Sequence, residues 1–186
     1  YGRVIANRVS KATSPSGSEF VDNDFRPDIP LAHGDKVEGK DWAVTALFTP
    51  GHAPDHLCFA VDTAGVLLSG DHVMAWNTSV VAPPEGNMGQ YFASLDLLVG
   101  REDTLFLPGH GGRLENPQRM VRAYLVHRRW REQAILDALR NGHDTIQKIV
   151  AVVYRGLDAR LVTAASLSVQ AHVEHLIERR LALSEG

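Results

Sequence analysis

The chain has 186 residues, of which 44% are hydrophobic and 22% charged, and its formal net charge is −3. These proportions match an average globular protein and exclude a wholly disordered or collagen-like chain. No apolar run approaches the roughly 20 residues that span a bilayer, so we expect a cytoplasmic protein with no membrane partner. The single cysteine, Cys58, excludes an internal disulfide and a cysteine-rich zinc site, so histidines and carboxylates must supply any metal ligands.

The N-terminal residues predict a strand followed by a long loop. Residues 1–9 alternate between apolar and polar side chains, whereas residues 10–30 are rich in serine, aspartate and proline and show little periodicity. The chain opens with Tyr1 rather than methionine and starts directly in this strand-like segment. We therefore expect it to be a fragment of a longer protein.

The middle of the chain has a mixed pattern of strands and one helix. Residues 42–48, 57–61 and 66–68 have the composition of buried strands. A short turn ending in glycine joins the last two, which predicts a β-hairpin. Residues 91–98 predict a helix, and residues 104–107 predict one more strand, closed by a Pro-Gly pair.

Beyond residue 117 the pattern predicts only helices. The first covers residues 118–140 and the second covers residues 146–153, where Asp144 and Gln147 have the spacing of a capping box. The third covers residues 163–183. Helices of this number and length suit a small helix-turn-helix-like unit.

Charge divides the chain at the same place as the secondary structure. Residues 1–117 carry 8 basic and 15 acidic residues, and residues 118–186 carry 11 basic and 7 acidic residues. We predict two domains over these two ranges. The basic helices leave open a different class of function, a nucleic-acid-binding module. In that case Arg128, Arg129 and Arg131 would contact a polyanion instead of pairing with nearby acids.

Three short segments combine glycine with histidine or aspartate where a predicted strand ends. They are residues 49–56 (TPGHAPDH), 69–72 (SGDH) and 108–112 (PGHGG). Glycine allows a sharp turn and the close approach of an ion, while a strand end holds a polar side chain firmly. Imidazole and carboxylate without thiolate form the ligand set expected for a catalytic zinc or iron centre that leaves a position open for water.

The order and spacing of these segments resemble the metallo-β-lactamase superfamily. In that family the corresponding segments bind two metal ions, and the resemblance assigns the ligands to His52, Asp71 and His110. It makes Asp71 the carboxylate shared by both ions and His56 a buried histidine that supports the ligands without binding metal. His72 follows Asp71 directly, and we expect its side chain to face the substrate, with an outward structural position as the alternative. Asp71 and His72 are therefore the candidate catalytic residues.

Further motifs resemble the branch of the family that ends in a winged-helix-like cap. They are VAPPEG at residues 81–86, NP at residues 116–117 and HRRWRE at residues 127–132. The implied fold is α+β, the C-terminal part of a metallo-β-lactamase-like αββα sandwich followed by a small three-helix winged-helix-like appendage. The implied function is hydrolysis by a metal-activated water, with two zinc ions in the intact protein and iron or manganese as alternatives. Small-molecule esters or thioesters and phosphodiesters are the implied substrate classes.

One part of the family pattern is missing from the sequence. The family's HxHxDH segment supplies further ligands and would precede His52, but the only histidine before that position is His33. We therefore expect the chain by itself to bind metal weakly and to be inactive. A family domain without its first half should also expose apolar surface and unprotected strands, so a homodimer is a further expectation.

Other functions remain as alternatives to metal-dependent hydrolysis of a small molecule. RNA is one candidate partner, because the branch with the C-terminal cap includes a mitochondrial endoribonuclease and the C-terminal helices are basic. A mono-iron sulfur dioxygenase also uses this fold, and the ligand types do not separate it from a hydrolase. A Ser-His-Asp hydrolase is disfavoured because the sequence contains no G-x-S-x-G motif.

Overall fold

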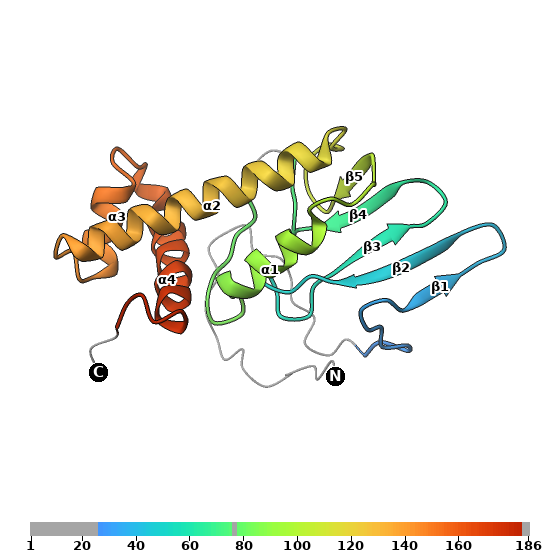
Figure 1. Cartoon of the computed structure of the whole chain (residues 1–186), viewed down its shortest axis with the longest axis horizontal. Helices are drawn as coiled ribbons and strands as arrows, with labels where there is room; N and C mark the ends of the chain where they lie inside the picture. Colours follow the sequence, from blue (N-terminus) through green and yellow to red (C-terminus); the bar gives the residue numbers. More distant parts are fainter. Residues whose placement is uncertain (1–25, 76–77, 184–186) are drawn as a thin grey trace.

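A computed structural model of the chain describes residues 26–75 and 78–183 (Figure 1). The strand predicted over residues 1–9 and most of the loop predicted over residues 10–30 lie outside these described residues. The described part contains a five-stranded sheet followed and covered by helices, as the predicted α+β class requires. No helix in this part combines the length and the apolar character that crossing a membrane requires.

The strands of the sheet lie in the same order as in the sequence. They are β1 (Lys36–Glu38), β2 (Ala43–Phe48), β3 (Leu57–Val61), β4 (Val66–Gly70) and β5 (Leu105–Pro108). Strands β1 to β4 are antiparallel neighbours, so the predicted hairpin of β3 and β4 is confirmed. Strand β5 pairs in parallel with β4 after the chain crosses over through helix α1 (Met88–Leu98).

This topology makes β2, β4 and β5 run in the same direction. Strands β2 and β4 are each antiparallel to β3, and β5 is parallel to β4. The loops that follow these strands therefore leave the sheet at the same end, where functional sites of sheet proteins are often built. They are the loops that carry the glycine-containing segments.

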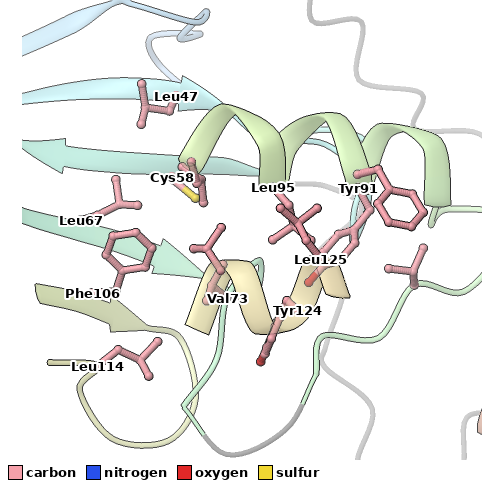
Figure 2. Packing of buried hydrophobic residues seen from close by; sticks show 14 of the residues in the cluster. Leu47, Cys58, Leu67, Val73, Tyr91, Leu95, Phe106, Leu114, Tyr124 and Leu125 are labelled. Atoms are coloured by element: carbon pink, nitrogen blue, oxygen red, sulfur yellow. The ribbon is translucent and has the colours of Figure 1, made fainter. Parts of the chain in front are cut away.

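One face of the sheet packs against α1 and the first half of helix α2 (Pro117–Arg140). Figure 2 shows Leu67 and Phe106 of the strands on the same side as Tyr91 and Leu95 of α1. All four side chains are 0% exposed. Leu67 and Phe106 are register partners on β4 and β5, and alternation along each strand directs them to this face.

The opposite face of the sheet leaves large apolar side chains open to solvent. Phe48, Leu68 and Leu107 are 44%, 38% and 39% exposed. Leu68 and Leu107 are register partners, so they stand next to each other on this face. The sequence predicts such an apolar surface, and the homodimer that would cover it stays a prediction.

The C-terminal helices form a second core with the second half of α2. They are α3 (Ile146–Val153), the short 3₁₀ helix η1 (Ala159–Leu161) and α4 (Val162–Glu178). Ile135, Ile149 and Leu176 lie at the centre of this core and are no more than 1% exposed. The prediction of an all-helical C-terminal segment is confirmed for its described residues.

Helix α2 belongs to both cores. Val121 and Leu125 lie in the core of the sheet, whereas Ile135 and Ala138 lie in the core of the C-terminal helices. Figure 1 shows α2 running from the sheet to α3 and α4. Because this helix is shared, the division into domains 1–117 and 118–186 stays a prediction.

Two helix ends differ from the sequence prediction. Thr145 rather than Asp144 is the N-cap of α3, since its Oγ1 accepts a hydrogen bond from the Lys148 N–H. Asp144 instead pairs with the Lys148 ammonium at 2.7 Å. Helix α4 ends earlier than predicted, at Glu178, because Arg180 turns the backbone with a left-handed φ of 59°. Apolar periodicity alone does not show such a turn.

Candidate metal centre

Three loops meet at the end of the sheet where β2, β4 and β5 terminate. Asp71 follows β4, and its Oδ2 lies 3.9 Å from His52 Nε2 and 3.6 Å from His110 Nε2. His52 comes from the loop after β2, and His110 comes from the loop after β5. The His52 and Asp71 side chains are 22% and 17% exposed, whereas that of His110 is 56% exposed. The structure thus brings the predicted ligands together in a group that is open on the side of His110.

The His52 ring is oriented by a backbone carbonyl. His52 Nδ1 lies 2.6 Å from the carbonyl oxygen of Val80. Because a carbonyl oxygen only accepts hydrogen bonds, Nδ1 must carry the proton and donate it. The neutral ring therefore keeps its lone pair on Nε2, the nitrogen that faces Asp71. A histidine that binds metal is held in its tautomer by this kind of hydrogen bond.

His56 uses both of its ring nitrogens inside the protein. Its Nε2 accepts a hydrogen bond from the Asp71 N–H at 3.2 Å, and its Nδ1 lies 2.9 Å from Thr49 Oγ1. Burial, and secondly the charge of His52, lower the pKa of His56 to about 4. The ring is therefore neutral near pH 7, holds the backbone of Asp71 and has no nitrogen left for a metal. The family resemblance implies a supporting role of this kind, which stays a prediction.

His72 occupies a different place from the one predicted. Its side chain is 0% exposed, and its ring centroid lies 4.7 Å from that of Tyr91 and 5.8 Å from that of His56. Burial, and secondly the charge of His56, lower the pKa of His72 to about 3. Helix α1 covers the ring through Tyr91, so His72 faces neither a substrate nor solvent. The structure gives this side chain a packing role.

Glycines at the strand ends make room for these side chains. Gly70 has a left-handed φ of +51°, and a Cβ at this position would lie 2.6 Å from His56 Nε2. A Cβ at Gly109 would lie 2.8 Å from Asp71 Oδ1. The sequence predicts close approach of an ion at these glycines. In the structure the protein's own His56 and Asp71 use that space.

We expect Gly70→Ala to lower the free energy of unfolding more than Gly65→Ala does. Both glycines have left-handed φ angles, +51° and +61°, but the nearest atom to a Cβ at Gly65 is Thr104 Oγ1 at 3.6 Å. The conformation alone costs an alanine about 1–2 kcal/mol at either position. The overlap with His56 should add about 1–3 kcal/mol at Gly70. Urea unfolding measures both losses, and equal values would contradict the tight packing of His56 on Gly70.

The donor atoms suit a divalent metal ion in type and position but are too few to complete a site. Each gap between Asp71 Oδ2 and an imidazole Nε2 is longer than a hydrogen bond and shorter than the sum of a Zn–N and a Zn–O bond, about 4.1 Å. A cation can therefore reach both atoms of each pair. Among residues 26–75 and 78–183, however, no group of three or more His, Cys, Asp and Glu side chains could hold a metal by itself. We interpret the two pairs as part of a larger ligand set.

Two residues that support the ligands, Ser79 and Arg128, are not predicted from the sequence to do so. Ser79 Oγ donates a hydrogen bond to the Asp71 carbonyl, and Arg128 Nη2 donates one to the Ser79 carbonyl. Arg128 is only 4% exposed, so it neither pairs with a surface acid nor contacts a polyanion. Helical spacing could have identified it, because Arg128 lies two turns after Val121 and one turn after Leu125 on the buried stripe of α2.

Family models identify both parts of the chain. Residues 6–110 match the model of the Metallo-beta-lactamase superfamily, and residues 145–186 match the model of the Beta-lactamase associated winged helix domain. The chain therefore belongs to the metallo-β-lactamase superfamily, and its C-terminal segment is a winged helix domain of the kind found with that fold. The fold class predicted from the resemblance is confirmed.

Similar proteins cover most of this chain but are themselves longer. The lactamase-like protein adaB of Aspergillus niger is 30% identical over 139 residues, which make up 75% of this chain and 39% of that protein. The beta-lactamase-like protein 2 homolog of Drosophila melanogaster is 31% identical over 150 residues, 79% of this chain and 50% of that protein. The chain thus spans half or less of the length of these relatives.

Two solved structures are also similar to most of this chain and are themselves longer. A metallo-beta-lactamase family protein from Thermus thermophilus has a TM-score of 0.74 and 25% identity, covering 87% of this chain and 52% of its own. A beta-lactamase domain protein from Burkholderia ambifaria has a TM-score of 0.70 and 25% identity, covering 84% of this chain and 49% of its own. Both similarities extend over the sheet and the C-terminal helices together, since each covers more than four fifths of the chain.

Proposed function

We propose that the chain supplies His52, Asp71 and His110 to the metal centre of a hydrolase. The observation that carries this proposal is that two imidazole Nε2 atoms face one carboxylate oxygen, at 3.9 Å and 3.6 Å. The hydrogen bond from His52 to Val80 supports it, because that bond leaves the Nε2 lone pair directed at Asp71. Membership of the metallo-β-lactamase superfamily, whose members are in general hydrolytic metalloenzymes, supports the same conclusion.

The residues of this chain would bind the metal and hold its ligands in place, and the metal would provide the reactivity. A bound divalent ion supplies the Lewis acidity that makes a nucleophile of water at neutral pH. His52 and His110 each offer an imidazole Nε2, and Asp71 offers the carboxylate oxygen that faces both. His56 fixes the Asp71 backbone, so the carboxylate is held before any metal arrives.

Zinc is the metal we propose, as two ions in a complete centre, with iron and manganese as the alternatives that metal analysis would detect. Zinc suits imidazole and carboxylate ligands and needs no thiolate. The three donors described here are fewer than two four-coordinate ions require. We therefore propose that the chain without further ligands is inactive and that a segment of the HxHxDH type completes the centre.

The contacts of the basic residues do not favour the nucleic-acid alternative. Arg131 donates from Nη1 to the Val153 carbonyl at 3.2 Å, and its guanidinium carbon lies 3.9 Å from the Tyr154 ring centroid. Arg179 pairs with Glu132 at 2.7 Å. Arginines held by the protein in this way contribute less to a phosphate-binding surface. We propose a small ester, thioester or phosphodiester rather than RNA as the substrate.

Zinc titration of the purified chain tests the ligand assignment. We expect weak binding that His52→Ala, Asp71→Asn and His110→Ala each reduce at least about tenfold. Asp55→Asn is the matched control, because Asp55 is an exposed carboxylate in the same loop as His52. Competition with a chromophoric chelator gives the affinities. Equal affinities for the wild type and all three ligand variants would rule out this centre.

A chain extended at its N-terminus by a family segment that carries HxHxDH tests the hydrolase itself. Elemental analysis should find about two zinc ions in the extended chain, which should hydrolyse at least one of the ester, thioester and phosphodiester classes. A chelator or Asp71→Asn should abolish turnover. An extended chain that binds two ions and hydrolyses none of these classes contradicts the proposed activity. Stoichiometric zinc in the unextended chain contradicts the proposed incompleteness.

A further inference from the structure

We propose that Arg128 is a positioning residue for the ligands Asp71 and His52. It acts through the short segment Ser79–Val80, which contacts both ligands. This inference rests on the proposed function, because it explains how the ligands of that centre are held. It assigns a role in the centre to α2, the helix that leads into the winged helix domain.

The Ser79–Val80 segment touches both ligands with neighbouring backbone and side-chain groups. Ser79 Oγ donates a hydrogen bond to the Asp71 carbonyl, and the Val80 carbonyl accepts the proton of His52 Nδ1 at 2.6 Å. Ser79 is 1% exposed, so its position is fixed by contacts inside the protein. A shift of this segment would therefore move the backbone of Asp71 and release the tautomer of His52.

Arg128 of α2 contacts the Ser79–Val80 segment. Its Nη2 donates to the Ser79 carbonyl, and its guanidinium carbon lies 5.3 Å from the Tyr91 ring centroid. The side chain is 4% exposed, and its Nε has no hydrogen-bond partner within the described part of the chain. Burying a guanidinium costs free energy unless hydrogen bonds and ring contacts offset it. A buried arginine with these contacts is therefore expected to hold the Ser79–Val80 segment in position.

Helix α2 makes a second contact with the chain that follows Asp71, through Tyr124. Tyr124 lies one turn before Arg128, and its hydroxyl donates to the Met74 carbonyl at 2.9 Å and lies 3.3 Å from the Met74 N–H. Met74 lies three residues after Asp71, and Ser79 directly precedes Val80. One face of α2 thus contacts the chain both after Asp71 and before Val80. The position of the metal ligands is coupled to a helix whose other half belongs to the C-terminal core.

The test compares Arg128→Met and Arg128→Lys with the control Arg129→Met, whose side chain is 65% exposed and pairs with Asp96 at 3.6 Å. The first readout is the tautomer of His52 in the metal-free chain, from ¹⁵N chemical shifts of the imidazole. We expect the proton on Nδ1 in the wild type and in the control. Arg128→Met should give a mixture of tautomers, and Arg128→Lys should restore Nδ1, because an ammonium can still donate to the Ser79 carbonyl.

The second readout is zinc affinity, which Arg128→Met should lower about 10- to 100-fold, as supporting contacts of metal ligands commonly do. A folded Arg128→Met with the tautomer and affinity of the wild type would overturn the proposal. If Arg128→Met does not fold, Ser79→Ala replaces it. This variant removes the hydrogen bond to Asp71 and keeps the Val80 carbonyl that accepts from His52. Affinity should therefore fall while the His52 ring keeps its proton on Nδ1, and unchanged affinity would overturn the proposal.

These outcomes separate this inference from the proposed function. The tautomer is measured without metal, so it reports on Arg128 even if the centre binds no zinc. If zinc binding is insensitive to His52, Asp71 and His110, the proposed function fails while the tautomer shift still stands. If those ligands matter and Arg128 changes neither readout, only the positioning role fails.

Discussion

The free energy of unfolding of the metal-free chain should fall by about 4 kcal/mol between about pH 8 and about pH 5. The cause is that two buried histidines stay neutral in the folded state. Burial is the larger cause in both, and it lowers the pKa of His56 to about 4 and that of His72 to about 3. In the unfolded chain both rings take up a proton as the pH falls through about 6.5. The unfolded state then binds more protons, so stability is lost between about 6.5 and the folded pKa values.

The contribution of His72 can be separated by His72→Phe. The His72 ring is 0% exposed, and a phenyl ring of similar shape removes the titratable group from this buried site. Each neutral buried histidine adds about 1.4 kcal/mol per pH unit to the slope of stability against pH. We expect His72→Phe to remove about half of the slope between about pH 6 and pH 5.

Urea unfolding at a series of pH values, with a chelator present, measures this slope. The control is His143→Gln, in the turn after α2, where the side chain is not fully buried. It should leave the slope within error of the wild type. A slope in His72→Phe as steep as that of the wild type would contradict the buried neutral state of His72.

Phe106→Ala should lower the free energy of unfolding by about 3–5 kcal/mol, the usual cost of emptying a fully buried phenylalanine site. Phe106 is 0% exposed and lies in the core between the sheet and its helices. Its backbone also exchanges two hydrogen bonds with Leu114, at 3.0 and 2.9 Å. The loss is a large part of the stability of a domain of this size. Because β5 leads directly to His110, zinc affinity should fall as well.

Leu107→Ala is the matched control on the same strand. Leu107 is 39% exposed on the other face of the sheet, so its truncation should cost about 1 kcal/mol or less. Denaturant unfolding at several protein concentrations compares the two variants. Equal costs would show that the face with Leu107 is buried in solution, and a cost that rises with protein concentration would indicate a second copy on that face.

The proposed role of Arg128 links the winged helix domain to the metal ligands through α2. The winged helix domain is joined to the metallo-β-lactamase part by α2, and the buried face of α2 also supports the loop of Asp71. A change in the packing of the C-terminal helices is therefore expected to reach the metal ligands through Tyr124 and Arg128. The Glu132 carboxylate, paired with His175 at 2.6 Å and Arg179 at 2.7 Å, ties α2 to α4 one turn further along.

The secondary structure was largely predictable because its signals are local. The turn before Val66, the proline at the start of α2 and the apolar spacing of α3 each identify an element without reference to the rest of the chain. The end of α4 was not predictable in this way, because the turn at Arg180 is stabilised by hydrogen bonds back to the last turn of the helix rather than by a glycine.

The sequence by itself determined the chemistry of the candidate centre, since the residue types and the glycines beside them can be identified in three short segments. Only the tertiary structure decided that His52 and His110 face the same oxygen of Asp71, because this depends on β2, β4 and β5 running in one direction. It also decided that His72 is buried and that Arg128 reaches Ser79. Contacts between residues so far apart in the chain arise from the packing of α1 and α2 on the sheet, which no local pattern encodes.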